Sequence, residues 1–123
     1  MKITSFKPLI LTNDAENTVA LFEELGFEVR HEKDGINGKD INAFMMKDAN
    51  GFSVSVTKTP IPRDMTLISM NVDDFDEAYN FLLSKGFVNA QGDKITDTGS
   101  SKATLMVSPS GFGISISQHI KKN

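Results

Sequence analysis

The feature that most restricts the fold of this chain is a short strand-like pattern that occurs twice. Gly51 and Phe52 open the first copy, and Gly111 and Phe112 open the second one sixty residues later; the residues that follow read SVSV and GISI. Apolar β-branched residues alternate with small polar ones, which is the period of a strand with one buried face and one open face. We therefore expect two equivalent strands whose serines face away from the core.

The same shift of sixty residues aligns the rest of the chain. It pairs Asp14 with Asp74, Gly26 with Gly86, Phe27 with Phe87, Ala43 with Ala103 and Met46 with Met106. Several of these positions are predicted helix caps and turns, where backbone geometry restricts the residue. We interpret the pattern as a tandem repeat within a single domain, with module one at 1–59, a proline-containing linker at 60–64 and module two at 65–120. Coincidental likeness of two α/β halves is the alternative.

Each half is predicted to have the order β-α-β-β-β. In the first half we expect a helix capped by Asn13 or Asp14 and ended by Gly26, a turn-rich stretch at 33–40, and strands at 3–11, 27–31, 41–47 and 52–58. In the second half we expect a helix from Asp73 or Asp74 to Gly86, a loop with a weak strand at 91–102, a frayed end at 121–123, and strands at 67–72, 87–90, 103–107 and 112–118. The predicted fold class is α+β.

Composition excludes several kinds of site. The chain has no cysteine, so disulfides, thiolate metal sites and a cysteine nucleophile are excluded. Its net charge of −3 argues against nucleic acid or an anionic membrane as a partner. Because no stretch has the pattern of a signal peptide or a membrane span, we expect a cytoplasmic protein.

The order and spacing of these motifs resemble the vicinal oxygen chelate superfamily, which includes glyoxalase I, extradiol dioxygenases and bleomycin-resistance proteins. The matching segments are 12–14, 25–29 and 48–52 in the first half, and 72–74, 85–87 and 108–112 in the second. The resemblance implies curved mixed sheets around a shared cleft, with the helices outside, and a homodimer. It also implies, for the enzymes of the superfamily, a divalent metal held by His, Glu or Gln from the first and last strand of each module.

The residues at the equivalent metal-ligand positions are Lys7, Ser55, Leu67 and Ser115. A protonated lysine and a leucine have no lone pair to offer, and a serine hydroxyl is a poor ligand for a divalent metal. A register slip of two residues brings in Leu9, Ser53 or Thr57, Ser69, and Gly113 or Ser117, which do not restore a site. We therefore predict no metal and no cofactor.

The same face is the candidate binding surface for a small molecule. Its predicted ligand-binding residues are Lys7, Leu9, Phe44, Met46, Ser55, Leu67, Ser69, Asn71 and Ser115. Core packing is the competing interpretation of Phe44 and Met46, and a surface position is the alternative for Lys7, which otherwise could pair with an anionic ligand or act as a base. His31 and His119 are expected on the surface, so no catalytic residue is assigned.

The function predicted from these residues is metal-independent binding of a small, partly apolar molecule in the cleft, as in bleomycin-resistance proteins. The alternative is a metal-dependent enzyme of the glyoxalase or dioxygenase type, with ligands at other positions. A third possibility is a structural or regulatory module whose cleft is empty.

Overall fold

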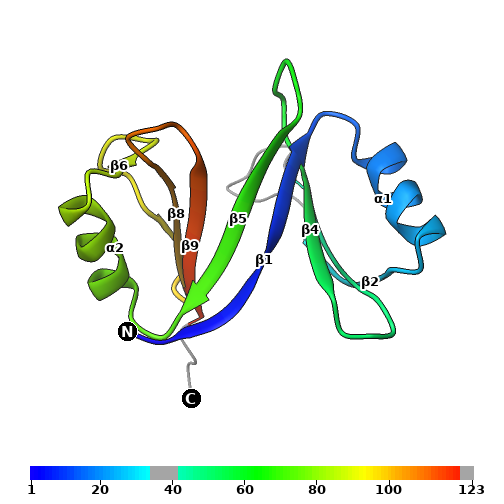
Figure 1. The fold of residues 1–123 in the computed structure, drawn as a ribbon, viewed down its shortest axis with the longest axis horizontal. Coiled ribbons are helices and arrows are strands. Elements are labelled where there is room, and N and C mark those ends of the chain that lie inside the picture. The colour runs from blue at the N-terminus through cyan, green and yellow to red at the C-terminus, as the bar shows by residue number, and fades with distance from the viewer. Residues whose placement is uncertain (34–41, 120–123) are drawn as a thin grey trace. The chain divides into compact units, whose positions relative to one another are not determined.

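The computed structural model describes residues 1–33 and 42–119 (Figure 1). Its backbone divides into two compact units, one formed by Lys7–Thr66 and the other by Met1–Phe6 together with Leu67–Asn123. The predicted turn-rich stretch lies outside the described residues except for Lys33, and so does the predicted frayed end. Within the described residues, no helix is both long enough and apolar enough to cross a membrane.

The described residues of the first unit form one helix and a four-stranded sheet. Its elements are β1 (Ile3–Thr12, of which residues 7–12 belong here), α1 (Ala15–Glu24), β2 (Glu28–Lys33), β3 (Asn42–Lys47) and β4 (Ser53–Lys58). The strand order is β2-β3-β4-β1, in which β1 runs parallel to β4 and the other pairs are antiparallel. The predicted β-α-β-β-β order is thus confirmed in this unit.

Helix α1 begins and ends where the sequence predicts. The Asp14 carboxylate caps it by accepting a hydrogen bond from the backbone N–H of Asn17, 3.3 Å away. Gly26 follows its C-terminus with a φ of +106°, a conformation that is strained for residues with a side chain. The apolar side of α1 then packs on the sheet, in a core formed by Ala15, Met46, Val54 and Val56 with partly buried Ile10, Val19, Phe22, Phe27 and Phe44.

The second unit repeats this architecture. Its elements are β5 (Met65–Val72), α2 (Phe75–Ser84), β6 (Val88–Asn89), β7 (Thr96–Asp97), β8 (Ser101–Val107) and β9 (Gly113–His119). The strand order is β5-β9-β8-β6, with β7 paired to β8, so the weak strand predicted within 91–102 is the short β7. The core consists of Met70, Val72, Phe75, Ala78, Leu82, Met106 and Ile116.

The start of the chain belongs to this second unit, which the sequence gives no sign of. The N-terminal ammonium lies 2.7 Å from the Glu77 carboxylate. The backbone N–H of Lys2 donates to Asp73 Oδ1, and the backbone N–H of Asp73 donates to the Lys2 carbonyl. These contacts attach residues 1–6 to the beginning of α2.

The two Gly-Phe turns have the same backbone but different supporting side chains. In the turn before β4, Asp48 Oδ1 accepts a hydrogen bond from the backbone N–H of Phe52 at 2.8 Å. In the turn before β9, Ser108 Oγ accepts from the backbone N–H of Phe112 at 3.0 Å. The repeated glycine at each turn has a positive φ, which explains why the same residue occurs twice.

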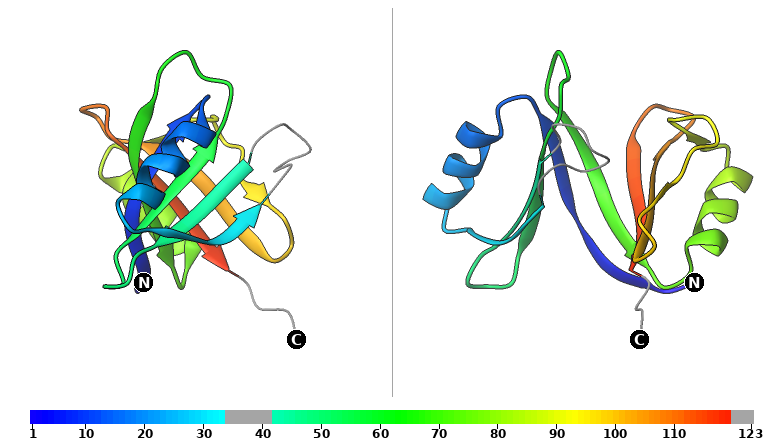
Figure 2. Two further views of the ribbon diagram at one scale, coloured as in Figure 1. Left: turned by 90° about the vertical axis from the view of Figure 1, so that its right-hand side faces the viewer. Right: turned by 180° about the vertical axis from the view of Figure 1, so that it is seen from behind.

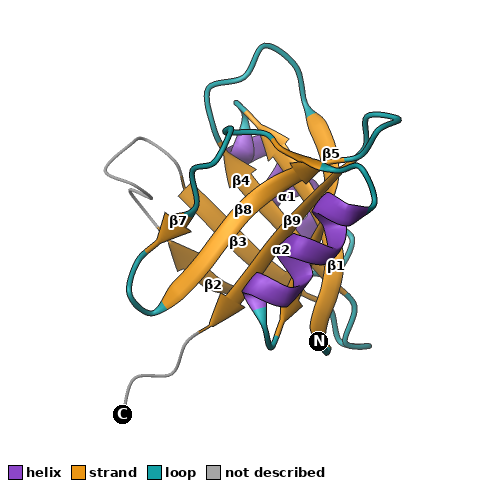
Figure 3. Cartoon of the chain, turned by 90° about the vertical axis from the view of Figure 1, so that its left-hand side faces the viewer, coloured by secondary structure: helices purple, strands orange, loops and turns teal. Residues whose placement is uncertain are grey.

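In each unit, the helix covers one face of that unit's own sheet (Figures 2 and 3). The helix-covered face contains the apolar core residues, and no helix of the described residues lies on the opposite face. We call this opposite surface the helix-free face of each unit. It carries the polar alternation that the sequence predicts, and it is where candidate binding residues are sought.

Candidate functional site

The helix-free face of the first unit is organised by the register of β1, β3 and β4. Leu9 pairs with Ser55 across the parallel ladder, and Ser55 pairs with Met45 across the antiparallel one. Ser55 is only 5% exposed, so its hydroxyl lies under neighbouring side chains rather than in open solvent. Lys7 lies on the same side of β1 as Leu9, because side chains alternate along a strand, and it is half-buried.

The structure corrects the placement of two predicted binding residues on β3. Met46, 2% exposed, belongs to the core beneath α1, and Phe44 packs against the same core. The reason is the antiparallel register, which pairs Met46 with Val54 and Phe44 with Val56. The β3 residue that shares the helix-free face with Ser55 is Met45, which the prediction omitted. The sequence holds a signal for Met45. If Val54 and Val56 are buried in the core, the tight turn at Asp48–Gly51 sets the pairing of the two strands and puts Met45 opposite Ser55.

The helix-free face of the second unit gathers the other predicted residues. Ser69 pairs with Ser115, and Asn71 pairs with Ser117, in the parallel ladder of β5 and β9. The Ser117 hydroxyl donates a hydrogen bond to Asn71 Oδ1 at 2.5 Å, which fixes the amide. Leu67 lies two residues before Ser69 on the same face of β5 and is 6% exposed. This face is therefore polar over two rows and apolar at the Leu67 row.

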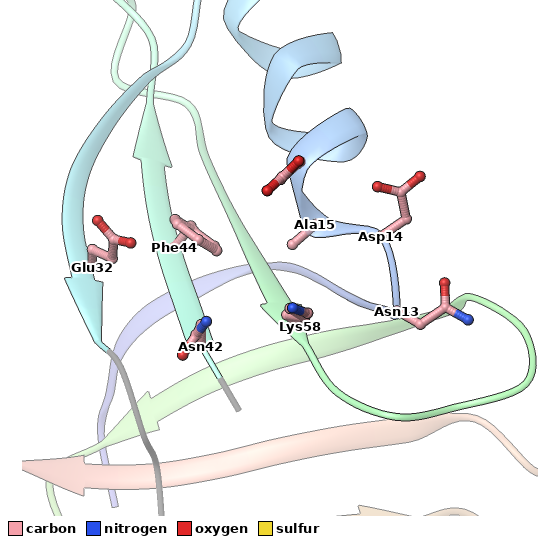
Figure 4. A pocket seen from close by; sticks show the side chains of 8 residues that line it. Asn13, Asp14, Ala15, Glu32, Asn42, Phe44 and Lys58 are labelled. Atoms are coloured by element: carbon pink, nitrogen blue, oxygen red, sulfur yellow. The ribbon is translucent and has the colours of Figure 1, made fainter. Parts of the chain in front are cut away.

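A pocket of about 470 Å³ lies elsewhere in the first unit, at the start of α1. Figure 4 shows the Phe44 ring pointing from β3 toward Ala15 at the first turn of the helix. The lining residues are Asn13, Asp14, Ala15, Glu16, Glu32, Asn42, Phe44 and Lys58. Carboxylates outnumber the single ammonium here, but the Asp14 carboxylate already serves as the helix cap. The sequence does not indicate this pocket, because its residues come from four separate segments of the chain.

One charged residue on the helix-free face of the first unit has a perturbed pKa. Desolvation lowers the pKa of Lys7 below its ordinary value, and repulsion from the Lys47 ammonium lowers it further. His31 and His119 are both exposed, so neither histidine is a buried group on this face. Among the described residues of this face, Lys7 is therefore the one whose pKa burial lowers.

Comparison with solved structures reveals clear structural neighbours. Methylmalonyl-CoA epimerase from Mycobacterium tuberculosis matches with a TM-score of 0.72 at 13% identity, over 97% of this chain and 90% of that chain. A glyoxalase/bleomycin resistance protein/dioxygenase superfamily member from Vibrio splendidus 12B01 matches with 0.62 at 16%, over 95% and 99%. Glyoxalase I from Zea mays matches with 0.71 at 12%, over 98% of this chain and 45% of that one.

The chain has the fold of the vicinal oxygen chelate superfamily. No family model and no curated protein sequence matches it. Because the identities to the solved structures lie between 12% and 16%, this likeness describes the backbone and leaves the chemistry to be argued from the chain's own residues.

The residues at the predicted metal-ligand positions of this vicinal oxygen chelate fold do not fit a divalent metal. Leu67 has no donor atom, and the protonated Lys7 ammonium has no lone pair. Ser55 and Ser115 offer only hydroxyls, which bind such ions weakly. In the part of the chain that the structure describes, no group of three or more His, Cys, Asp or Glu side chains is placed to hold a metal ion. Metal chemistry at these positions therefore lacks a donor set.

Proposed function

We propose that this chain binds a small, partly apolar molecule on the helix-free faces of its sheets without a resident divalent metal, in the manner of bleomycin-resistance proteins. The proposal is supported by the side chains at the predicted metal-ligand positions, which are two hydroxyls, one ammonium and one leucine side chain. A scaffold that retains its sheets but has lost the ligands can still bind through shape, hydroxyls and apolar contact.

The composition of the first unit's face supports this proposal. Leu9 and Met45 provide apolar contact on either side of the buried Ser55. Methionine adapts its shape to irregular partners, which suits a flexible ligand. A cleft shared by the two modules, a homodimer and a cytoplasmic location stay predictions.

Two measurements test the absence of a resident metal. After equilibrium dialysis against Zn²⁺, Ni²⁺, Mn²⁺ or Fe²⁺ and removal of free ion, elemental analysis should find no stoichiometric metal. In a thermal-shift screen of small apolar and amphipathic molecules, ligands should raise the melting temperature equally with and without a chelator, since binding to the folded state raises stability whatever its chemistry. Retention of about one metal ion per chain would overturn the proposal, because protein metal sites bind specifically.

A metal-dependent enzyme of the glyoxalase or dioxygenase type is the second candidate. It is favoured by the names of the similar structures, since methylmalonyl-CoA epimerase and glyoxalase I are enzymes. This candidate predicts turnover of a glutathione hemithioacetal, a catechol or methylmalonyl-CoA that is stimulated by added metal and abolished by a chelator. If added metal stimulates the turnover of none of the three compounds, these three enzymatic activities are excluded for this chain.

A further inference from the structure

Two lysines lie on the helix-free face of the first unit, on either side of β4. Lys47 of β3 pairs directly with Ser53 in the antiparallel ladder. Lys7 of β1 precedes Leu9 by two residues, as Ser53 precedes Ser55, and Leu9 pairs with Ser55 in the parallel ladder. The register therefore places Lys7 and Lys47 on one face with Ser53 between them. We call these two residues the lysine pair.

The lysine pair has no counter-charge within the described part of the chain. No ion pair or hydrogen bond of either ammonium is found there. Glu28 lies opposite Lys47 in the β2–β3 ladder, but its carboxylate is 3.5 Å from the Arg30 guanidinium. The Asp48 carboxylate, next in sequence to Lys47, accepts hydrogen bonds from backbone amides of its own turn. Both neighbouring carboxylates are thus engaged elsewhere.

An unpaired, half-buried ammonium is an unusual feature for a protein of this charge. Lysines are rarely removed from water unless a partner compensates, because the charged form loses its hydration. The chain as a whole carries a net charge of −3, whereas this part of the sheet face carries two neighbouring positive charges. An anion placed between them would compensate the lost hydration of the Lys7 ammonium and pair with the exposed Lys47 ammonium.

The residues next to the lysine pair on the same face indicate which other chemical groups the anion should contain. Leu9, Ser55 and Met45 lie side by side across β1, β4 and β3, directly adjacent to the Lys7, Ser53 and Lys47 row. A ligand whose charged group lies at the lysine pair would extend its remaining atoms over Leu9 and Met45. The face is therefore positive at one end and mainly apolar beside it.

We propose that the lysine pair binds the carboxylate or phosphate group of a small organic anion whose apolar part lies on Leu9 and Met45. This inference rests on the proposed metal-independent binding function and specifies the chemical class of its ligand. In this arrangement the Lys7 ammonium supplies a positive charge at a position where the resemblance to the superfamily predicts a metal ligand.

The test uses three probes that share one apolar tail: hexanoate, hexyl phosphate and hexanol. Each is titrated into the ¹⁵N-labelled full chain, and amide chemical shifts report both the site and the dissociation constant. Lys7→Gln and Lys47→Gln remove one charge each. Lys58→Gln is the matched control, because Lys58 lies on β4 of the same sheet but pairs with Thr12 and Asn42 on the helix-covered face.

The expected result is that one or both anions shift the amides around Leu9, Met45 and Ser55 and bind more tightly than hexanol. Each lysine-pair variant should weaken anion binding by about tenfold, the size of one charge-assisted hydrogen bond, while Lys58→Gln leaves it unchanged. Preference for hexyl phosphate over hexanoate would identify a phosphate ligand, and the reverse a carboxylate.

Other outcomes would overturn the inference. Binding of hexanol as tight as that of both anions contradicts a role for the lysine pair. So does anion binding that Lys7→Gln and Lys47→Gln leave intact while the amide spectrum shows a folded chain. No shift on this face with either anion does the same. These failures leave the proposed function standing, which fails separately if the chain retains a divalent metal.

Discussion

The Leu67 side chain occupies the space above Gly113 in which a Cβ atom would otherwise stand. A Cβ built on Gly113 lies 2.6 Å from Leu67 Cδ2 and 3.3 Å from Leu105 Cδ1. Both contacts are shorter than carbon atoms adopt without movement. Gly113 therefore interrupts the polar alternation of β9 for a packing reason, and Leu67 closes this end of the second unit's helix-free face.

This contact predicts a coupled pair of substitutions. Gly113→Ala should lower the free energy of unfolding by about 1–3 kcal/mol, because the added methyl displaces a buried leucine. In a Leu67→Ala background, which itself costs about 2–5 kcal/mol, the same change should cost clearly less, with only the contact to Leu105 left to relieve. Urea unfolding of the four proteins of this double-mutant cycle measures the coupling. An equal cost of Gly113→Ala in both backgrounds would show that Leu67 is not the obstacle.

The fold was predictable from sequence because its signals are local. Asp14 and Asp74 mark helix starts, Gly26 and Gly86 mark helix ends, and the strands alternate with a period of two. Attachment of residues 1–6 to the second unit was not predictable, since it depends on contacts of Lys2 with Asp73, far away in sequence. Local pattern determines the elements, whereas their partners depend on tertiary contacts.

The candidate site was predicted less completely than the fold. Leu9 and Ser55 were assigned to one face, and the register pairs them. Met46 was assigned to the same face although it packs beneath α1, because an apolar run on β3 does not itself show which parity is buried. The proximity of Lys7 and Lys47 follows only from the strand order β3-β4-β1, which a single sequence does not specify.

Lys7 should make the stability of the chain depend on pH in the alkaline range. Its pKa is lowered in the folded state from 10.5, chiefly by desolvation. As pH rises through the folded pKa toward that ordinary value, the folded chain releases its proton first, so the unfolded chain binds more protons and stability rises. At neutral pH the ammonium is therefore a destabilising group.

Lys7→Met removes this group and should be more stable than the natural chain at pH 7, with the difference shrinking as pH approaches 10.5. Urea unfolding in buffers without organic anions gives the difference at each pH, and Lys58→Met supplies the baseline for losing one lysine from the same sheet. A difference that stays constant, or grows with pH, would contradict the desolvation of Lys7.

Ser5 offers a prediction of increased stability. Its hydroxyl is buried and has no hydrogen-bond partner among the described residues. A buried polar group without a partner costs about 1–3 kcal/mol, so Ser5→Ala should raise the free energy of unfolding by about 1 kcal/mol. Ser117→Ala is the control, because it removes a hydroxyl that donates to Asn71, and it should lower stability. Destabilisation by both substitutions would mean that Ser5 has a partner.

The two glycines that follow the helices should respond differently to alanine. Gly26 and Gly86 have φ values of +106° and +90°, so alanine at either position should cost about 1–2 kcal/mol from backbone strain. A Cβ on Gly26 meets no atom within 4 Å, whereas one on Gly86 lies 3.0 Å from Pro109 Cγ. Gly86→Ala should therefore be the more destabilising, and Pro109→Ala should remove the excess. Equal costs at the two glycines in thermal or urea unfolding would show that backbone strain alone, without the contact to Pro109, determines both.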